Sequence, residues 1–258
     1  MIAKLDPRGA TRLGRAVRAT TDGAAIATGA HREDHRQGNW LRDVILGGQD
    51  GLVNILGIIL GVIAGGGSDT VLLAAGFAAA ITESISMAAV GYTSSVSERD
   101  YYEAERARET AEIGAMPEAE RQEIRDIYAA KGFSGDLLDS VVNTITANRE
   151  TWLATMMGEE LHLQPVQSRD IFRTAVVIGV ATLIGHLIPL LPFLFLARTP
   201  ALILAIVLSA VALFGVGAYT AVTLVGDWRR SGLKFLAIGL GAAAIGFVVG
   251  RLFNSGGA

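Results

Sequence analysis

The chain has 258 residues, of which 51% are hydrophobic and only 18% are charged, and its mean hydropathy is +0.42. This composition is too apolar for an ordinary soluble domain of that length, and it indicates a protein that lies in a lipid bilayer. The chain contains no cysteine, which excludes disulfides, thiolate metal sites, iron–sulfur clusters and cysteine nucleophiles. Any metal ion must therefore be bound by oxygen, imidazole or thioether ligands.

Residues 1–42 form a basic arm in which Lys and Arg are set among Gly, Ala and Thr. This pattern predicts a disordered segment on the cytosolic side of the membrane. The arm lacks a long apolar core followed by a small-residue cleavage site, so it does not resemble a cleaved secretory signal. Its basic side chains are not interleaved with aromatic ones, so the lipid surface is an expected partner and nucleic acid is not.

Five stretches are apolar enough, over about 20 residues each, to cross the hydrocarbon core of a bilayer. They lie at roughly 44–64, 71–96, 172–196, 201–225 and 233–253. Membrane helices 1 and 2 thus fall within 43–97, and helices 3 to 5 within 171–258. Most basic residues outside these spans lie in the arm, in segment 98–170 and around Arg229 and Arg230, which places these parts in the cytosol and the carboxyl end outside.

Segment 98–170 is an acidic insert with sixteen Asp or Glu and eight Lys or Arg. Its pattern predicts that the second membrane helix continues to about Ala115 and ends at Met116-Pro117, because proline suits the first turn of a helix better than its interior. A second helix is expected from Pro117 to about Ala130 and a third from Ser134 to about Leu163. The expected fold is therefore an all-α membrane protein with five transmembrane helices and a cytosolic three-helix metal-binding insert between spans 2 and 3.

The insert contains candidate metal ligands at helical neighbour spacing. Carboxylates alone favour Mg²⁺ or Ca²⁺, whereas added thioether sulfur shifts the preference toward borderline ions such as Fe²⁺. In the alternative interpretation the glutamates form a solvated face and the methionines fill the core. The candidates are Glu109, Glu112, Glu120, Glu123, Met156, Met157 and Glu160.

Two spans contain acidic residues, although an ionisable group at mid-helix costs about 2.5–3.5 kcal/mol on insertion scales. Span 1 contains Asp50, with Asp43 seven residues earlier, and span 2 contains Glu83 and, four residues on, Met87. These four residues are expected to line a path for a cation or a proton, with pairing of Asp43 to Arg42 at the membrane interface as the alternative for that residue.

Two further features of the spans have two interpretations each. His186 in span 3 is either a proton relay or a buried, hydrogen-bonded imidazole, and we favour the second. Glycines four residues apart permit close helix packing, either within one protomer or at a dimer seam. These pairs are Gly47 and Gly51, Gly57 and Gly61, and Gly246 and Gly250.

From about Trp40 to its end, the chain resembles the vacuolar iron transporter family. The resemblance rests on the insert carboxylates and on four short motifs in the family's order. These are Arg42-Asp43-Val44-Ile45, Gln49-Asp50-Gly51-Leu52-Val53, Ile85-Ser86-Met87-Ala88-Ala89 and Met156-Met157-Gly158-Glu159-Glu160. The chain departs from the family at Gly91, where members commonly have a glutamate.

The resemblance implies a homodimer of five-span protomers that moves Fe²⁺ out of the cytosol in exchange for protons. Mn²⁺, Co²⁺ and Zn²⁺ are further candidate ions, and no organic cofactor is implied. The insert would capture the metal, and Asp50 and Met87 would line its path. The compact chain and short loops favour a prokaryotic inner membrane.

Two other classes of protein share parts of this pattern. The first is a membrane-anchored protein that binds or senses iron without transporting it, but a passive anchor has no need for Asp50 or Glu83 at membrane depth. The second is an enzyme of the di-iron carboxylate type, which would need Glu-x-x-His motifs. The only histidine of the insert, His162, completes no such motif, so no enzymatic activity is expected.

Overall fold

The computed structural model describes residues 38–223 and 226–255. Within these ranges every regular element is helical and no strand occurs. The predicted basic arm covers residues 1–42, and residues 1–37 of it lie outside the described part of the chain. The all-α fold is confirmed.

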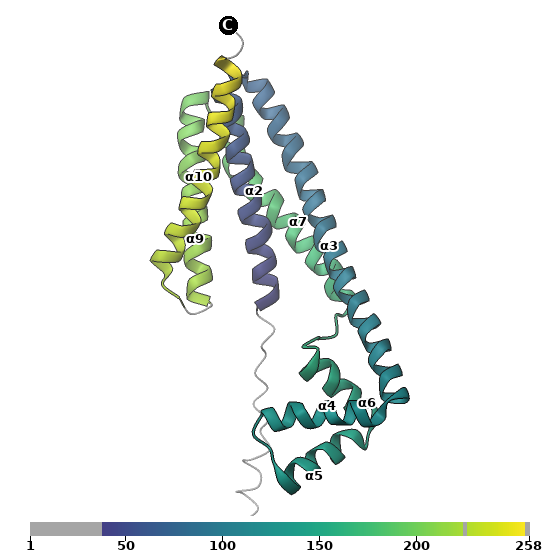
Figure 1. Cartoon of the computed structure of the whole chain (residues 1–258). Helices are drawn as coiled ribbons and strands as arrows, with labels where there is room; N and C mark the ends of the chain where they lie inside the picture. Colours follow the sequence, from purple (N-terminus) through teal and green to yellow (C-terminus); the bar gives the residue numbers. More distant parts are fainter. Residues whose placement is uncertain (1–37, 224–225, 256–258) are drawn as a thin grey trace, which may run out of the picture. The chain divides into compact units, whose positions relative to one another are not determined.

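In the described part of the chain, five helices are long and apolar enough to cross a membrane, and each overlaps one of the predicted spans. In Figure 1 they are labelled α2 (Gly38–Ala64), α3 (Asp69–Ala115), α7 (Ser168–Leu190), α9 (Arg198–Thr223) and α10 (Trp228–Ser255). The end of the third span differs from the prediction, because α7 stops at Leu190 and a separate short helix, α8 (Pro192–Phe195), follows. Pro192 occupies the first position of α8, where the missing N–H of proline costs no hydrogen bond.

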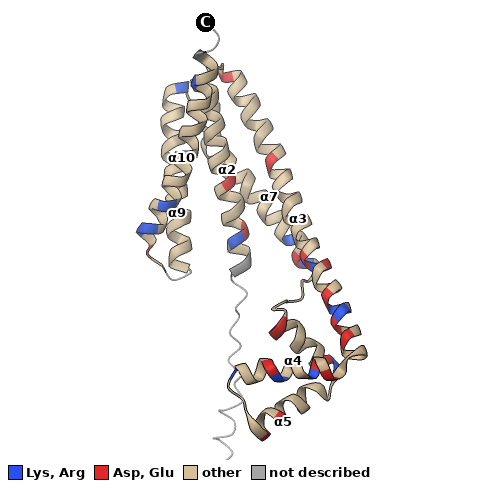
Figure 2. Cartoon of the chain, viewed as in Figure 1, with Lys and Arg blue, Asp and Glu red and all other residues tan. Residues whose placement is uncertain are grey.

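Helix α3 carries both a membrane-spanning segment and the first part of the insert without interruption (Figure 1). The Ser68 side chain caps its start by accepting a hydrogen bond from the backbone N of Val71. Its end at Ala115 is where Met116-Pro117 was predicted to stop it. Figure 2 shows charged residues gathered on the carboxyl-terminal part of α3 and on the insert, and few along α7 and α9.

The rest of the insert consists of α4 (Pro117–Ala130), α5 (Gly135–Thr146), α6 (Arg149–Thr155) and η2 (Met156–Glu160), a π-helical turn. Helix α4 has the predicted bounds, but the single third helix was a wrong prediction. The chain breaks at Asn148, whose side chain accepts hydrogen bonds from the backbone N of Glu150 and Thr151 at 2.9 and 3.0 Å. Asparagine is a preferred N-cap residue, so α6 begins anew there.

The insert has its own hydrophobic core, formed by α3 to α6 and the η2 turn. Apolar side chains from all of these elements meet in it, and the Arg149 guanidinium on α6 donates to the backbone O of Thr110 on α3 at 2.9 Å. The buried members are Ile113, Ile124, Leu138, Val142, Ile145, Trp152, Leu153, Met156 and Met157. This core fixes the faces of α3 and α4 that carry the insert glutamates.

The glycines of α2 serve close helix crossings within one protomer. A Cβ on Gly51 would lie 2.3 Å from the backbone O of Thr182 on α7, and one on Gly250 of α10 would lie 2.1 Å from the backbone O of Gly61. Backbones in contact leave no room for a side chain. Of the two alternatives for these glycines, packing within the chain accounts for all three pairs.

Three chain segments meet at one end of the membrane helices. Arg198, at the start of α9, pairs with Asp69 at the start of α3 with Nε and Oδ1 2.6 Å apart. Asn254, near the end of α10, donates to the backbone O of Ala64 at 3.2 Å. The five-span order predicts this, because the loops after spans 1 and 3 and the carboxyl end lie on the same side.

Candidate functional site

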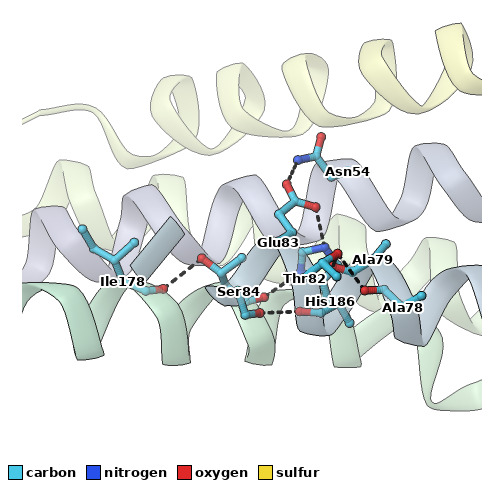
Figure 3. A network of polar contacts seen from close by, with 10 residues as sticks. Asn54, Ala78, Ala79, Thr82, Glu83, Ser84, Ile178 and His186 are labelled. Atoms are coloured by element: carbon cyan, nitrogen blue, oxygen red, sulfur yellow. Dashed lines mark hydrogen bonds and ion pairs between the residues drawn. The ribbon is translucent and has the colours of Figure 1, made fainter. Parts of the chain in front are cut away.

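Glu83 is the centre of a polar cluster between α2, α3 and α7 (Figure 3). Its Oε2 lies 2.9 Å from Nε2 of His186, and its Oε1 accepts a hydrogen bond from the Asn54 side-chain amide. His186 is completely buried, and its Nδ1 lies 2.9 Å from the backbone O of Thr182. The three helices therefore meet through polar side chains at membrane depth.

The hydrogen bonds of His186 restrict where its protons lie. The Thr182 carbonyl can only accept, so Nδ1 carries the hydrogen of that contact. Nε2 then faces the carboxylate of Glu83 at hydrogen-bond distance, and two acceptors do not approach so closely without a hydrogen between them. The pair of Glu83 and His186 therefore holds one proton, on the oxygen or on the nitrogen. The expected buried, hydrogen-bonded imidazole is what the structure contains, and its partner is a residue of the predicted path.

Of the other predicted path residues, Asp50 interacts with Glu83, whereas Asp43 and Met87 have other surroundings. Asp50 is half-buried, and its carboxylate lies close enough to that of Glu83 to interact with it. Two carboxyl groups in contact need a shared proton or a cation. Asp43 lies apart from the pair and accepts a hydrogen bond from the Thr174 hydroxyl at 3.2 Å. Met87 is half-buried one turn beyond Glu83 on α3.

Gly91, the departure from the family pattern, is buried against α7. A Cβ there would lie 2.8 Å from Cδ1 of Ile178 and 3.4 Å from Cα of Ala175. A glutamate side chain at this position would need α3 and α7 to move apart. The close packing of these two helices thus accounts for the glycine.

The insert has a second group of carboxylates, on α3, α4 and the η2 turn. Glu109 and Glu120 are 2% and 4% exposed, and one oxygen of each, Oε2, is buried without a hydrogen-bond partner. Glu112 is half-buried, whereas Glu123 and Glu160 are exposed. Buried carboxylate oxygens without donors are costly, and a cation would supply the missing partner.

The two methionines lie beside this group but within the hydrophobic core. Met156 is fully buried and Met157 is 2% exposed, which agrees with the core-filling alternative and leaves their role as ligands a prediction. In residues 38–223 and 226–255, no three Asp, Glu or His side chains are close enough together to hold a metal ion. To bind an ion, the insert carboxylates would therefore have to move closer together.

The electrostatics of the group raise the pKa of three of its members. Burial, followed by the charges of Glu123, Glu109 and Glu112, raises the pKa of Glu120 to about 7. Burial and the charge of Glu112 raise the pKa of Glu109, and burial and the charge of Glu123 raise the pKa of Glu160. Burial and neighbouring carboxylates favour the protonated form of these acids, and a divalent cation would displace the protons.

This shift predicts that, without metal, the insert loses stability as the pH rises. Folding raises the pKa of Glu120 from 4.5 to about 7, so the folded chain binds its proton more tightly than the unfolded chain. The free energy of unfolding should be highest below pH 4.5, fall by about 3 kcal/mol toward pH 7, and then stay level.

The measurement uses thermal unfolding of the detergent-solubilised chain in chelator, followed by tryptophan fluorescence. Trp152 lies in the insert core, so replacing Trp40 and Trp228 by phenylalanine leaves one reporter there. Glu120→Gln should flatten the pH dependence, and an unchanged slope in that variant would contradict the assignment to Glu120.

Comparison with known proteins adds to this geometry. Residues 41–251 match the model of the VIT family. The chain belongs to the VIT family. It is 33% identical over 225 residues to vacuolar iron transporter 1 of Arabidopsis thaliana, which covers 86% of this chain and 90% of the relative. It is 30% identical over 227 residues to vacuolar iron transporter 1 of Eucalyptus grandis, with 87% and 91% covered.

These matches confirm the resemblance that the motifs indicated. Vacuolar iron transporter 2 of Oryza sativa subsp. japonica is 34% identical over 189 residues, or 72% of this chain and 77% of the relative. These VIT family relatives are named as transporters, in agreement with the expectation of a protein that is not an enzyme.

Sequence reasoning missed two residues that contact the membrane cluster. Asn54 reaches Glu83 only because α2 and α3 pack together, and the backbone O of Thr182, one turn before His186 on α7, carries no sequence signal. The one sequence signal for Asn54 was that a buried carboxylate must have polar partners.

Proposed function

We propose that this VIT family protein carries ferrous iron across a membrane in exchange for protons. The observation that supports this best is the cluster of Asp50, Glu83, Asn54 and His186 at membrane depth. Such a cluster is costly to insert and is the kind of site that binds ions or protons in transporters. The names of the relatives support iron as the ion.

The proposed mechanism is competition for the same oxygens. When no metal is present, Asp50 and Glu83 share protons with each other and with His186. A divalent cation that reaches these carboxylates replaces the protons, and its departure lets them return. Because metal and proton exclude each other at Asp50 and Glu83, outward movement of one drives inward movement of the other.

We further propose that the insert is a cytosolic domain that captures the metal before it enters the membrane path. Its candidate ligands are the four glutamates of α3 and α4 together with Met156, Met157 and Glu160, and Asp43 and Met87 would complete the path. The unpartnered oxygens of Glu109 and Glu120 favour this role. With the insert in the cytosol, iron would leave the cytosol, and a prokaryotic inner membrane is the proposed location.

The proposed assembly is a homodimer. Asn54 is exposed on α2 although it lies in the apolar part of the helix, and the Glu83 side chain beside it is 23% exposed. Polar groups at this depth are unfavourable against lipid tails. A second copy packed over this face would cover them, and the path would then run beside the interface.

The test is a flux measurement in proteoliposomes with an imposed pH gradient. Under anaerobic, reducing conditions, a chelating dye inside reports Fe²⁺ entry and a second dye reports the internal pH. We expect Fe²⁺ entry to follow the gradient, to stop when an ionophore collapses it, and to be accompanied by proton counterflow. Fe²⁺ flux that ignores the gradient would overturn proton coupling.

The same vesicles separate transport from binding alone. If the purified chain binds Fe²⁺ but the vesicles show no flux under any gradient, the protein is an iron-binding or iron-sensing membrane protein. Substituting Mn²⁺, Co²⁺ or Zn²⁺ for Fe²⁺ in the assay defines the range of ions carried.

A further inference from the structure

A single arginine lies among the acidic side chains of the insert. Nη2 of Arg108 is 2.8 Å from Oε2 of Glu105 and 3.7 Å from Oε1 of Glu109, and its Nε is 3.8 Å from Oε2 of Glu112. All four residues are on α3, within two turns. A guanidinium remains charged at any physiological pH, so the metal-free cluster always contains this one fixed positive charge.

The three ion pairs are unequal. The closest carboxylate is that of Glu105, which is not among the proposed ligands, and Glu109 and Glu112 are almost 1 Å farther away. Even Glu105 Oε2 lacks a properly aligned hydrogen bond, as do Oε2 of Glu109 and of Glu120. Arg108 therefore supplies charge to the cluster without satisfying its buried oxygens.

We propose that Arg108 is a tethered competitor of the metal ion. In the metal-free state its guanidinium partly neutralises Glu109 and Glu112, and it turns fully to Glu105 when a divalent cation takes those carboxylates. This inference rests on the proposed function and deepens it. Competition from Arg108 would give the insert a moderate affinity for the metal. When the guanidinium returns to Glu109 and Glu112, it helps to release the metal toward the membrane path.

Glu105 has the complementary role in this scheme. It lies one helical turn before Glu109 and one turn before Arg108, so side chains at these positions share a face. Its carboxylate holds the guanidinium on the side away from Glu112. Without Glu105, the competitor would have no alternative partner and would remain on the ligands.

The first test compares the affinity of the purified full-length chain for Mn²⁺, an oxidation-resistant probe, and for Fe²⁺ by calorimetry. Arg108→Gln should bind each ion about tenfold more tightly, since one elementary charge a few ångströms from a divalent ion, in partial contact with water, has an effect of that size. Arg106→Gln is the matched control, an exposed arginine two residues away on α3. It should stay within about twofold of wild type.

A double-mutant cycle separates the proposed mechanism from general electrostatics. Glu105→Gln alone should weaken binding about tenfold, because Arg108 is then free to compete. In the Arg108→Gln background the same change should have almost no effect. An equal loss in both backgrounds would mean that Glu105 acts only through its charge, which would overturn the proposed exchange.

Transport supplies a second measurement. In proteoliposomes, Arg108→Gln should lower the KM for Fe²⁺ and also lower the maximal rate, because tighter capture slows release. A merely structural role for Arg108 would lower the rate without lowering KM. Arg108→Lys, which keeps the charge, should restore both values to within about threefold of wild type.

The possible failures are distinguishable. If Arg108→Gln and Arg106→Gln have the same affinity, the inference is wrong while the proposed function stands. If the wild-type chain binds no divalent ion in the insert, both the capture site and this inference are wrong. If Arg108→Gln does not fold, Arg108→Met takes its place in the double-mutant cycle, and unchanged or tighter binding by Glu105→Gln overturns the inference in either case.

Discussion

Replacing Asp50 by asparagine is expected to reduce proton-driven Fe²⁺ flux by about a hundredfold or more. The change keeps the size of the side chain but removes the charge that would bind the ion and the group that would take up the proton. Removing one carboxylate from the binding site of a divalent ion should weaken the binding by about 3 kcal/mol or more in partly desolvated surroundings, and each 1.4 kcal/mol corresponds to a tenfold change. Glu83→Gln should have an effect of the same order, because Glu83 contacts both Asp50 and His186.

The control for this experiment is Glu98→Gln. Glu98 is an exposed carboxylate on α3, beyond the apolar part of the helix, and its loss should leave flux within about twofold of wild type. Size-exclusion profiles of the variants exclude misfolding as the cause of inactivity. Proton-driven flux in Asp50→Asn that equals that of the control variant would show that Asp50 is not on the path.

The second large effect is expected from a single methyl group on α2. Gly51→Ala would place Cβ 2.3 Å from the backbone O of Thr182 and 2.7 Å from Nδ1 of His186. Neither atom can yield cheaply, because one is backbone and the other belongs to a fully buried ring. Forcing the helices apart should cost about 3 kcal/mol, seen as a lower unfolding temperature, together with loss of flux because His186 is displaced from Glu83.

Gly48→Ala is the matched control, three residues earlier on the same helix. A Cβ on Gly48 would lie 3.8 Å from the backbone O of Ala181, an ordinary van der Waals contact. This variant should unfold near the wild-type temperature or slightly above it, since alanine favours the helix. Equal behaviour of the two alanine variants would contradict the close crossing of α2 and α7.

The membrane helices could be predicted from sequence because they depend on local properties. Length and apolarity are sufficient to locate a span, and Pro117 and Gly132 punctuate the insert at the places where α3 and α4 end. The break at Asn148 was missed because the surrounding residues continue a helical pattern. A capping residue such as Asn148 does not interrupt the spacing of apolar residues, so the hydrophobic periodicity does not reveal the break.

Only part of the candidate membrane site could be predicted from the sequence. Asp50 and Glu83 stand out in the sequence because charge is rare at that depth. Their partners do not, since His186 lies 103 residues from Glu83 along the chain, and the contact depends on the angle at which α3 crosses α7. The crossing in turn depends on glycines whose spacing indicates close packing but does not identify the partner helix.

Helix α3 has a consequence for how the insert and the membrane cluster communicate. Glu83 and Glu109 belong to one unbroken helix, separated along its axis by about 40 Å at 1.5 Å per residue. The helix between them is continuous, so the number of intervening residues fixes the angle about the helix axis between the two side chains. One alanine added near Ser97 would turn everything beyond it by about 100°, whereas seven added residues would nearly restore the original direction. If capture and transport are coupled through this helix, activity should follow the phase of the insertion rather than its length.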